Sequence, residues 1–441
     1  MTQPPLGLHT DLYELRMVQT YLRHGMTGDA TFSLFVRPTA TRPWFLAAGL
    51  HRVLEVLDHF RYDGVAIDYL RTFGIDEDTL AWLAELAPRG EVTAIAEGTV
   101  VLADEPLLQV TAPLPFAQLL ETALMNVVHL ATLIATKAAR CVLAAQGRLI
   151  ADFGTRRAHG LEAGLEAARS AYLAGCVSTS NVEAGRRYGI PLVGTMAHSL
   201  IQAWGDEEAA FEAFVRDHPT HSTLLVDTYD TMRGVARAIA GGDRLRERGQ
   251  ELVAIRLDSG DLHGLAVEAR RALDAAGHTG TLIIASGGVD ERVIGDLVAS
   301  GAPIDAFGVG TAMTVSRDTP ALDIVYKLVE YDGVAHAKYS TSKVSLPGAK
   351  QVFRRGDPSR DVLGLRGEDL DGERLLEPIW RDGEMLVGTD LEAARERARA
   401  QLAMLPDAWH APSDSEGVPR PQLSPALRAL ADEVRTRELA R

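Results

Sequence analysis

Apolar residues in this chain fall into short runs that alternate with stretches of helical spacing. In residues 1–118 the runs are broken by turn residues, which indicates a mixed α/β unit. Residues 29–37 alternate apolar and polar side chains, as in a half-buried strand. Residues 91–113 predict short strands separated by Gly and Pro. From Leu119 to Gln146 apolar residues recur at helical spacing, which predicts one long amphipathic helix.

After this helix the chain repeats one theme, an apolar run, a polar loop and a helical stretch. Strands that alternate with helices indicate parallel βαβ units with right-handed crossovers. Seven runs in succession favour an α/β barrel, and a doubly wound open sheet is the alternative. No G-x-G-x-x-G follows the first run, which argues against that alternative. The runs are residues 148–153, 175–177, 191–194, 223–226, 252–257, 281–285 and 304–307.

The same patterns divide the chain into three parts. Residues 1–118 are predicted to form an N-terminal α/β sandwich domain, and residues 119–328 an irregular α/β barrel that carries the active site. Residues 329–441 are predicted to complete the sandwich and to end in a helical tail. A proline-bearing stretch near Pro412–Pro421 is expected to be flexible.

Composition narrows the class of protein. The net charge of −15 argues against nucleic acid or an anionic membrane as partner. No apolar run is expected to be long enough to cross a bilayer, and no secretory signal is visible. The two cysteines, Cys141 and Cys176, provide neither a disulfide framework nor metal-ligand spacing. These features predict a cytoplasmic protein.

Polar loops follow all seven apolar runs, and in a parallel barrel such loops meet at one mouth. We therefore expect a single site for a highly charged substrate. The loops are Gly154–Arg157, Ser178–Asn181, Thr195–Ser199, Asp227–Asp230, Asp258–Asp261, Ser286–Gly288 and Gly308–Thr311.

Three of these loops have the composition of anion sites. Glycine at Gly287, Gly288 and Gly310 lets backbone N–H groups approach a phosphate, although such glycines also serve in tight turns. Arg156 and Arg157 offer bidentate donors to phosphate or carboxylate. The alternative for the arginines is a surface ion pair with Glu162 or Glu166.

Carboxylates and a histidine complete the predicted mouth. Substrates with a pyrophosphate group usually carry Mg²⁺, held by one or two carboxylates. Asp258 is the preferred ligand and Asp227 is left undecided, while Asp230 and Asp261 could instead be helix N-caps. His198 lies at a predicted strand–helix junction, where either catalysis or a structural role is open.

Eight segments of the sequence resemble the nicotinate phosphoribosyltransferase family, in the family's order. They are TDLYELRMVQTYLRHG from Thr10, LLETALMNVVHLATLIATKAAR from Leu119, DFGTRRAHG from Asp152, STSNVEAGRRYGIPLVGTMAHS from Ser178, IRLDSGDL from Ile255, IIASGGVDE from Ile283, FGVGTAM from Phe307 and SLPGAKQVFR from Ser345.

The resemblance implies a type II phosphoribosyltransferase, in which an open-faced α/β sandwich accompanies an irregular α/β barrel. It implies a homodimer with the active site at the interface. Tyr13 would stack on the pyridine ring, and His198 would be the histidine that ATP phosphorylates. Asp258 and Arg256 would act in catalysis. The substrate-binding residues would be Arg156, Arg157, Ser180, Ser199, Ser286, Gly287, Gly288, Gly310 and Thr311.

The implied reaction joins nicotinate to phosphoribosyl pyrophosphate, with Mg²⁺ as cofactor and ATP as co-substrate, in NAD salvage. Related nicotinamide enzymes carry an aspartate near the position of Ser180, so STSN here favours the acid over the amide. The sequence departs from many relatives at Gly287-Gly288, where they carry Asn or Asp, and it lacks a cysteine-rich tail.

Three other functions compete with this one. Nicotinamide and quinolinate phosphoribosyltransferases are the nearest, but the quinolinate enzymes are much shorter and lack the phosphorylated histidine. A non-catalytic phosphosugar-binding barrel would have lost His198, Arg156 or Asp258. An aldolase would need a lysine for Schiff-base chemistry, and none of the seven loops contains one.

Overall fold

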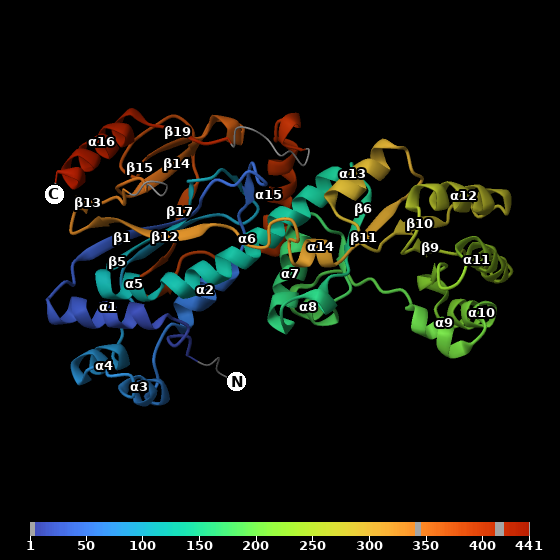
Figure 1. Cartoon of the computed structure of the whole chain (residues 1–441), viewed down its shortest axis with the longest axis horizontal. Coiled ribbons are helices and arrows are strands. Elements are labelled where there is room, and N and C mark those ends of the chain that lie inside the picture. The colour runs from blue at the N-terminus through green and yellow to red at the C-terminus, as the bar shows by residue number, and fades with distance from the viewer. Residues whose placement is uncertain (1–4, 340–344, 411–418, 441) are drawn as a thin grey trace. The chain divides into compact units, whose positions relative to one another are not determined.

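A computed structural model describes residues 5–339, 345–410 and 419–440 of the chain. Its internal contacts divide the chain into two compact units (Figure 1). The first unit contains the chain up to Thr136, Ala321–Trp409 and the C-terminal residues from 413 onward. The second contains Lys137–Pro320 with residues 410–412. Most of the predicted flexible stretch Pro412–Pro421 lies outside the described residues.

The first unit is built on a seven-stranded antiparallel sheet in the order β13-β12-β1-β5-β3-β17-β18. Helices α1 and α5 lie together on one side of this sheet, and strands β14, β15 and β19 lie on the other (Figure 1). The strands of the large sheet are β1 (Asp29–Val36), β3 (Glu91–Ile95), β5 (Pro106–Pro113), β12 (Ile324–Tyr331), β13 (Val334–Ala335), β17 (Leu376–Arg381) and β18 (Glu384–Met385).

The first unit contains two smaller sheets and most of the helices outside the barrel. The four-stranded sheet has β14 (Lys350–Arg354), β15 (Val362–Leu365), β16 (Glu373–Arg374) and β19 (Gln422–Leu423), and the two-stranded sheet has β2 (Phe45–Leu46) and β4 (Val100–Val101). The helices are α1 (Leu12–Arg23), α2 (Leu50–His59), α3 (Gly64–Arg71), α4 (Glu77–Ala84), α5 (Leu114–Leu119), α15 (Leu391–Ala403) and α16 (Pro425–Leu439).

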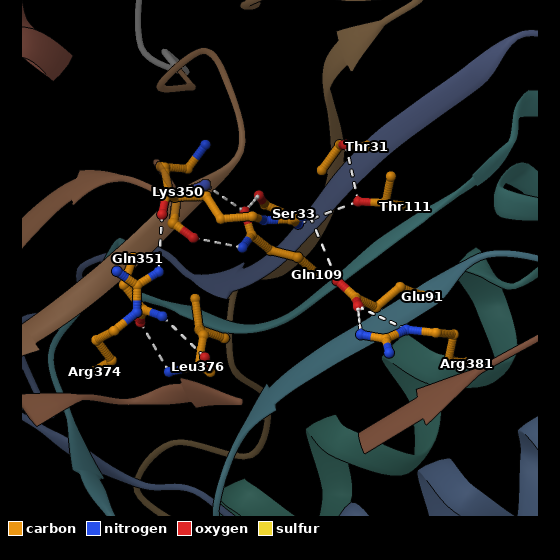
Figure 2. A network of polar contacts seen from close by, with 11 residues as sticks. Thr31, Ser33, Glu91, Gln109, Thr111, Lys350, Gln351, Arg374, Leu376 and Arg381 are labelled. Atoms are coloured by element: carbon orange, nitrogen blue, oxygen red, sulfur yellow. Dashed lines mark hydrogen bonds and ion pairs between the residues drawn. The ribbon is translucent and has the colours of Figure 1, made fainter. Parts of the chain in front are cut away.

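Strand β1 is buried on both faces, so the predicted strand is confirmed but its half-buried character is wrong. Every residue of β1 except Asp29 is buried. The polar face of β1 meets β14 of the small sheet through a hydrogen-bonded network (Figure 2). Ser33 Oγ donates to Gln109 Oε1 at 3.1 Å, and Gln109 exchanges two hydrogen bonds with the backbone of Lys350. The polar alternation therefore marks a buried interface between two sheets.

The Lys350 side chain is fully buried beside this network. Its Nζ lies 2.8 Å from both Leu346 O and Gly348 O. A neutral amine has two N–H donors, and these two carbonyls accept both. Burial lowers the pKa of Lys350 to about 7, so much of the folded protein carries this amine neutral at neutral pH.

We expect Lys350 to make the stability of the protein depend on pH. Above about pH 7 the unfolded chain keeps a proton on this lysine that the folded chain has lost, so the free energy of unfolding rises with pH up to about pH 10. Below about pH 7 both states are protonated and the contribution is constant. Thermal unfolding of Lys350→Met should show a flatter rise over this range than the wild type. The exposed Lys338→Met is the control, and equal slopes in all three proteins would contradict the prediction.

The second unit is a curled parallel sheet in the order β7-β6-β11-β10-β9-β8. In chain order β6 is the first strand of this sheet and β11 is the last, and the two pair side by side, as in a barrel. Leu192 adds a single parallel bridge to Thr179 at one edge, and no pairing within the described residues joins Leu192 to β8. The strands are β6 (Leu149–Asp152), β7 (Ser178–Thr179), β8 (Thr223–Leu225), β9 (Ala254–Leu257), β10 (Leu282–Ala285) and β11 (Ala306–Val309).

This sheet confirms the predicted irregular α/β barrel and corrects two of its runs. Residues 191–194 contribute one bridge instead of a strand, because the loop before α9 leaves the sheet there. The strand expected at 175–177 lies at Ser178–Thr179, because Gly175 still belongs to the turn after α7. The helices are α7 (Leu161–Leu173), α8 (Val182–Tyr188), α9 (His198–Trp204), α10 (Glu207–Asp217), α11 (Thr231–Arg246), α12 (Leu262–Ala275), α13 (Glu291–Ala299) and α14 (Thr311–Thr314).

Helix α6 (Glu121–Ala144) is the long helix predicted from residue 119, and the division between the units falls within it. It is long and apolar enough to cross a membrane, which corrects the expectation that no apolar run has that length. Within the described residues, 67% of its most apolar window is buried inside the protein. Its apolar length is therefore accounted for by packing in a core. Both cysteines are free and buried.

Candidate active site

Arg256 projects from β9, and the fold leaves several of its donors unused. Its Nη1 donates to Thr195 Oγ1 at 2.6 Å, while its Nε is buried and has no hydrogen-bond partner. The nearest carboxylate, Asp258, is 3.9 Å away. Burial lowers the pKa of Arg256, while Asp258 raises it. A largely desolvated guanidinium with unused donors is suited to an anionic ligand.

Arg156 and Arg157 lie in a short 3₁₀ turn, Thr155–Arg157, directly after β6. Both are exposed, and neither side chain forms a hydrogen bond or an ion pair within the described residues. The surface ion pair with Glu162 is absent, because Glu162 lies 3.6 Å from Arg187 instead. Besides burial, which has the largest effect, the positive charge of Arg156 also lowers the pKa of Arg256. The unpaired guanidinium groups therefore concentrate positive charge in one region of an acidic protein.

The four aspartates after β8 and β9 divide into two roles. Asp230 and Asp261 accept hydrogen bonds from the backbone at the starts of α11 and α12, so they are N-caps. Asp258 Oδ1 accepts from Ser286 Oγ at 2.6 Å, which joins the loops after β9 and β10. Asp227 Oδ2 accepts from Asp258 N at 3.1 Å and from Ser259 Oγ at 2.6 Å. The Asp227 Oδ1 atom is buried without a partner.

These two carboxylates fit the way Mg²⁺ binds with phosphorylated substrates. In the part of the chain that the structure describes, no three His, Cys, Asp or Glu side chains form a metal cluster. Mg²⁺ is commonly held by one or two carboxylates, with substrate phosphates and water as the other ligands. The unpartnered Asp227 Oδ1 and the nearby Asp258 offer such a pair.

His198 is the first residue of α9 and is half-buried. Its Nδ1 lies 3.1 Å from Thr228 Oγ1, in the loop after β8. Nε2 has no hydrogen-bond partner among the described residues, and Ser199 beside it is exposed. One ring nitrogen is thus held by the protein while the other is free for chemistry.

The glycine loop after β10 has a backbone shape that favours glycine, and β11 carries a glycine for lack of space. Gly287 and Gly288 have φ of +81° and +72°. A Cβ at Gly287 would lie 1.7 Å from Asp258 O, so a side chain there would displace the loop that carries Asp258. A Cβ at Gly308 would lie 2.5 Å from the Phe153 ring. Gly310 precedes α14, whose first residue is Thr311.

Three residues of this region were missed by the sequence reasoning. Thr195 and Thr228 hold Arg256 and His198, and both lie in loops already recognised as polar. Phe153 packs against Gly308, and its ring centre is 5.9 Å from the Arg256 guanidinium. Phe153 is the last residue of the predicted apolar run 148–153, which was the available signal. Ser180 is exposed after β7. Tyr13 belongs to the first unit, where it is 48% exposed.

Fold and site together define a parallel α/β barrel with a cationic, glycine-rich mouth suited to a phosphorylated substrate. Comparison with known proteins gives the family. The model of the nicotinate phosphoribosyltransferase N-terminal domain matches residues 8–129, and that of the nicotinate phosphoribosyltransferase family matches residues 149–351. The chain belongs to the nicotinate phosphoribosyltransferase family.

Individual relatives agree with this assignment. A Mycobacterium tuberculosis nicotinate phosphoribosyltransferase is 48% identical over 407 residues, which cover 91% of this chain and 88% of the relative. The Bacillus subtilis enzyme is 42% identical, with 84% and 78% covered. The crystal structure of the human nicotinic acid phosphoribosyltransferase has a TM-score of 0.82 at 29% identity, and the match covers 96% of this chain and 99% of that one.

Proposed function

We propose that this protein transfers the phosphoribosyl group of phosphoribosyl pyrophosphate to nicotinate, which yields nicotinate mononucleotide and pyrophosphate in NAD salvage. The observation that carries the proposal is Arg256, which is desolvated and has a buried Nε without a partner. Arg156 and Arg157 add unpaired positive charge. The family assignment supports this choice among anionic substrates.

The reaction needs alignment and charge neutralisation more than covalent chemistry. The ring nitrogen of nicotinate attacks C1 of the ribose as pyrophosphate leaves, through an oxocarbenium-like transition state. Arg256 and Arg156 would neutralise the leaving group, and the Gly287-Gly288 loop would offer backbone N–H groups to the ribose phosphate. Bound Mg²⁺, held by Asp258 with Asp227, would supply further charge on the pyrophosphate.

The proposal includes ATP as co-substrate and a phosphorylated His198, as in an enzyme of the ligase class. ATP would phosphorylate Nε2, because Thr228 occupies Nδ1 and Nε2 has no partner among the described residues. Hydrolysis of the phosphohistidine would then drive the transfer, which is chemically possible without it.

A homodimer is the proposed assembly, with the active site at its interface. Exposed apolar residues at the barrel mouth support it. Leu161 and Val182, the first residues of α7 and α8, are 84% and 71% exposed. They follow directly on the loops of Arg157 and Ser180, so a partner that covered them would also border the site. The two free cysteines support the cytoplasm as the proposed compartment.

The test is a product assay on the purified protein with phosphoribosyl pyrophosphate, Mg²⁺ and either nicotinate or nicotinamide, with and without ATP. We expect mononucleotide from nicotinate, faster with ATP. Product from nicotinamide would overturn the acid preference argued from Ser180. No product from either base would overturn the proposed function in favour of a non-catalytic barrel.

Tyr13→Ala is expected to raise the KM for nicotinate by about tenfold and to change the KM for phosphoribosyl pyrophosphate much less. Tyr13 is exposed enough to stack on a pyridine ring, and loss of one aromatic stacking contact costs roughly 1 kcal/mol or somewhat more. Steady-state kinetics with each substrate varied in turn would measure the two values. The exposed Tyr69→Ala, on α3 of the same unit, is the control. Equal changes in both KM values for Tyr13→Ala would argue against stacking.

A further inference from the structure

We infer that Asp152 is a positioning residue, whose buried carboxylate fixes the loop of Arg156 and the loop of Ser180 relative to each other. The inference rests on the proposed function, because it concerns the residues that would grip the substrates. Asp152 is the last residue of β6 and is 1% exposed. The reaction described above makes no use of it.

Each oxygen of the carboxylate binds a different loop. Oδ1 accepts a hydrogen bond from Gly154 N at 2.9 Å, at the start of the loop that carries Arg156. Oδ2 accepts from Thr179 Oγ1 at 2.7 Å, at the end of β7. The backbone carbonyl of Asp152 also accepts from Ser180 N at 2.9 Å. One residue therefore holds the first turn of both loops.

The hydrogen bonds continue from Thr179 into α8. Thr179 Oγ1 accepts from Asn181 N at 3.1 Å, so its own hydrogen is free to be donated to Asp152. Asn181 Oδ1 in turn accepts from Ala184 N at 3.0 Å and caps α8. Gly154 N–H and the Thr179 hydroxyl both donate to residue 152, and a carboxylate offers an acceptor to each of them.

The arginine loop is confined from its other side as well. A Cβ at Gly154 would lie 1.5 Å from Thr314 Oγ1, so the loop passes directly against α14. Its backbone lies between Thr314 and the Asp152 carboxylate. Burial raises the pKa of Asp152, and the hydrogen bonds from Thr179 and Gly154 oppose this. Those bonds favour the charged form, which accepts at both oxygens.

Asp152→Asn tests the inference because it keeps the size of the side chain and replaces one acceptor by a donor. With the new amide group facing Thr179, the Thr179 hydroxyl hydrogen loses its acceptor on residue 152, which leaves a buried donor unpaired. We expect the KM for phosphoribosyl pyrophosphate to rise roughly tenfold or more, with kcat within about threefold of the wild type. A merely structural residue would lower the melting temperature and the active fraction, and so the apparent kcat, without changing KM.

Thr179→Val keeps the carboxylate but removes its bond to β7, together with the acceptor for Asn181 N, so it serves as a second variant if Asp152→Asn does not fold. In a double-mutant cycle the two changes should not add, because each breaks the same contact. Ser170→Ala is the matched control, since it removes a buried hydroxyl that bonds Glu166 at 3.0 Å on α7. It should lower stability and leave both KM values unchanged. Additive effects, or unchanged KM in both Asp152→Asn and Thr179→Val, would overturn the inference.

Calorimetric titration with inorganic pyrophosphate separates this inference from the proposed function. Binding that is several-fold weaker in Asp152→Asn than in the wild type would support the positioning role even if no base were converted. Wild-type turnover with unchanged pyrophosphate affinity in both variants would remove the inference and leave the proposed function. If the wild type showed no turnover and also no pyrophosphate binding, both the inference and the proposed function would be overturned.

Discussion

Arg256→Ala is expected to lower kcat/KM for mononucleotide formation by roughly 10²- to 10³-fold, the usual effect of removing one preorganised donor from a developing negative charge. The Arg256 guanidinium is desolvated, its Nε has no partner, and its nearest carboxylate is 3.9 Å away. The substitution would remove few contacts within the protein besides the hydrogen bond to Thr195. Most of the decrease in kcat/KM should therefore come from the lost interaction with the pyrophosphate group of the substrate.

Two further variants sharpen this test. Arg271→Ala removes an exposed arginine from α12, the helix that follows the β9 loop, and should leave kcat/KM unchanged. Arg256→Lys keeps the charge but loses the planar set of donors, so it should recover only part of the activity. Initial rates at low substrate concentration give kcat/KM directly. If kcat/KM fell by less than about fivefold in Arg256→Ala, or fell as much in Arg271→Ala as in Arg256→Ala, the anion-binding role of Arg256 would be wrong.

The barrel could be predicted from the sequence because its strands are short, apolar and separated by helices, and each ends at a polar loop. The periodicity could not predict which element packs on the second face of a strand. The alternation in β1 was correctly attributed to a strand, yet the partner for its polar face is β14, more than three hundred residues later in the chain. Ser33 bonds Gln109 of β5, and Gln109 in turn bonds the backbone of Lys350 on β14. Such long-range pairing is not encoded in local spacing.

The site was predictable to different depths at different residues. Asp230 and Asp261 precede helices, so their N-cap role follows from local chain geometry. Asp227 and Asp258 have the same local setting but are distinguished by tertiary contacts with Ser259 and Ser286. Arg256 lies inside an apolar strand run and entered through the family resemblance, because its unused donors appear only once β9 is folded beside Thr195.

His198→Ala is expected to abolish the ATPase activity and the stimulation of transfer by ATP, while slow transfer without ATP persists. Thr228 holds Nδ1, and Nε2 is without a partner among the described residues, so the imidazole is oriented to accept a phosphoryl group at one nitrogen. Alanine offers no such acceptor. The ratio of rates with and without ATP should therefore fall to one. Phosphate release and mononucleotide formation, measured in the same reaction, give both quantities.

The controls separate the loss of a phosphoryl acceptor from damage to the barrel. His263→Ala removes a half-buried histidine whose Nδ1 lies 2.9 Å from Ser300 Oγ in the same unit, and ATP stimulation should survive it. Thr228→Val leaves the imidazole in place but frees Nδ1, so ATP stimulation should weaken without vanishing, because the ring loses its fixed orientation. Unchanged ATP dependence in His198→Ala would refute the phosphohistidine. Loss of the slow ATP-independent transfer as well would show that His198 acts in the transfer step itself. In the proposed mechanism that step relies on Arg256 and Asp258.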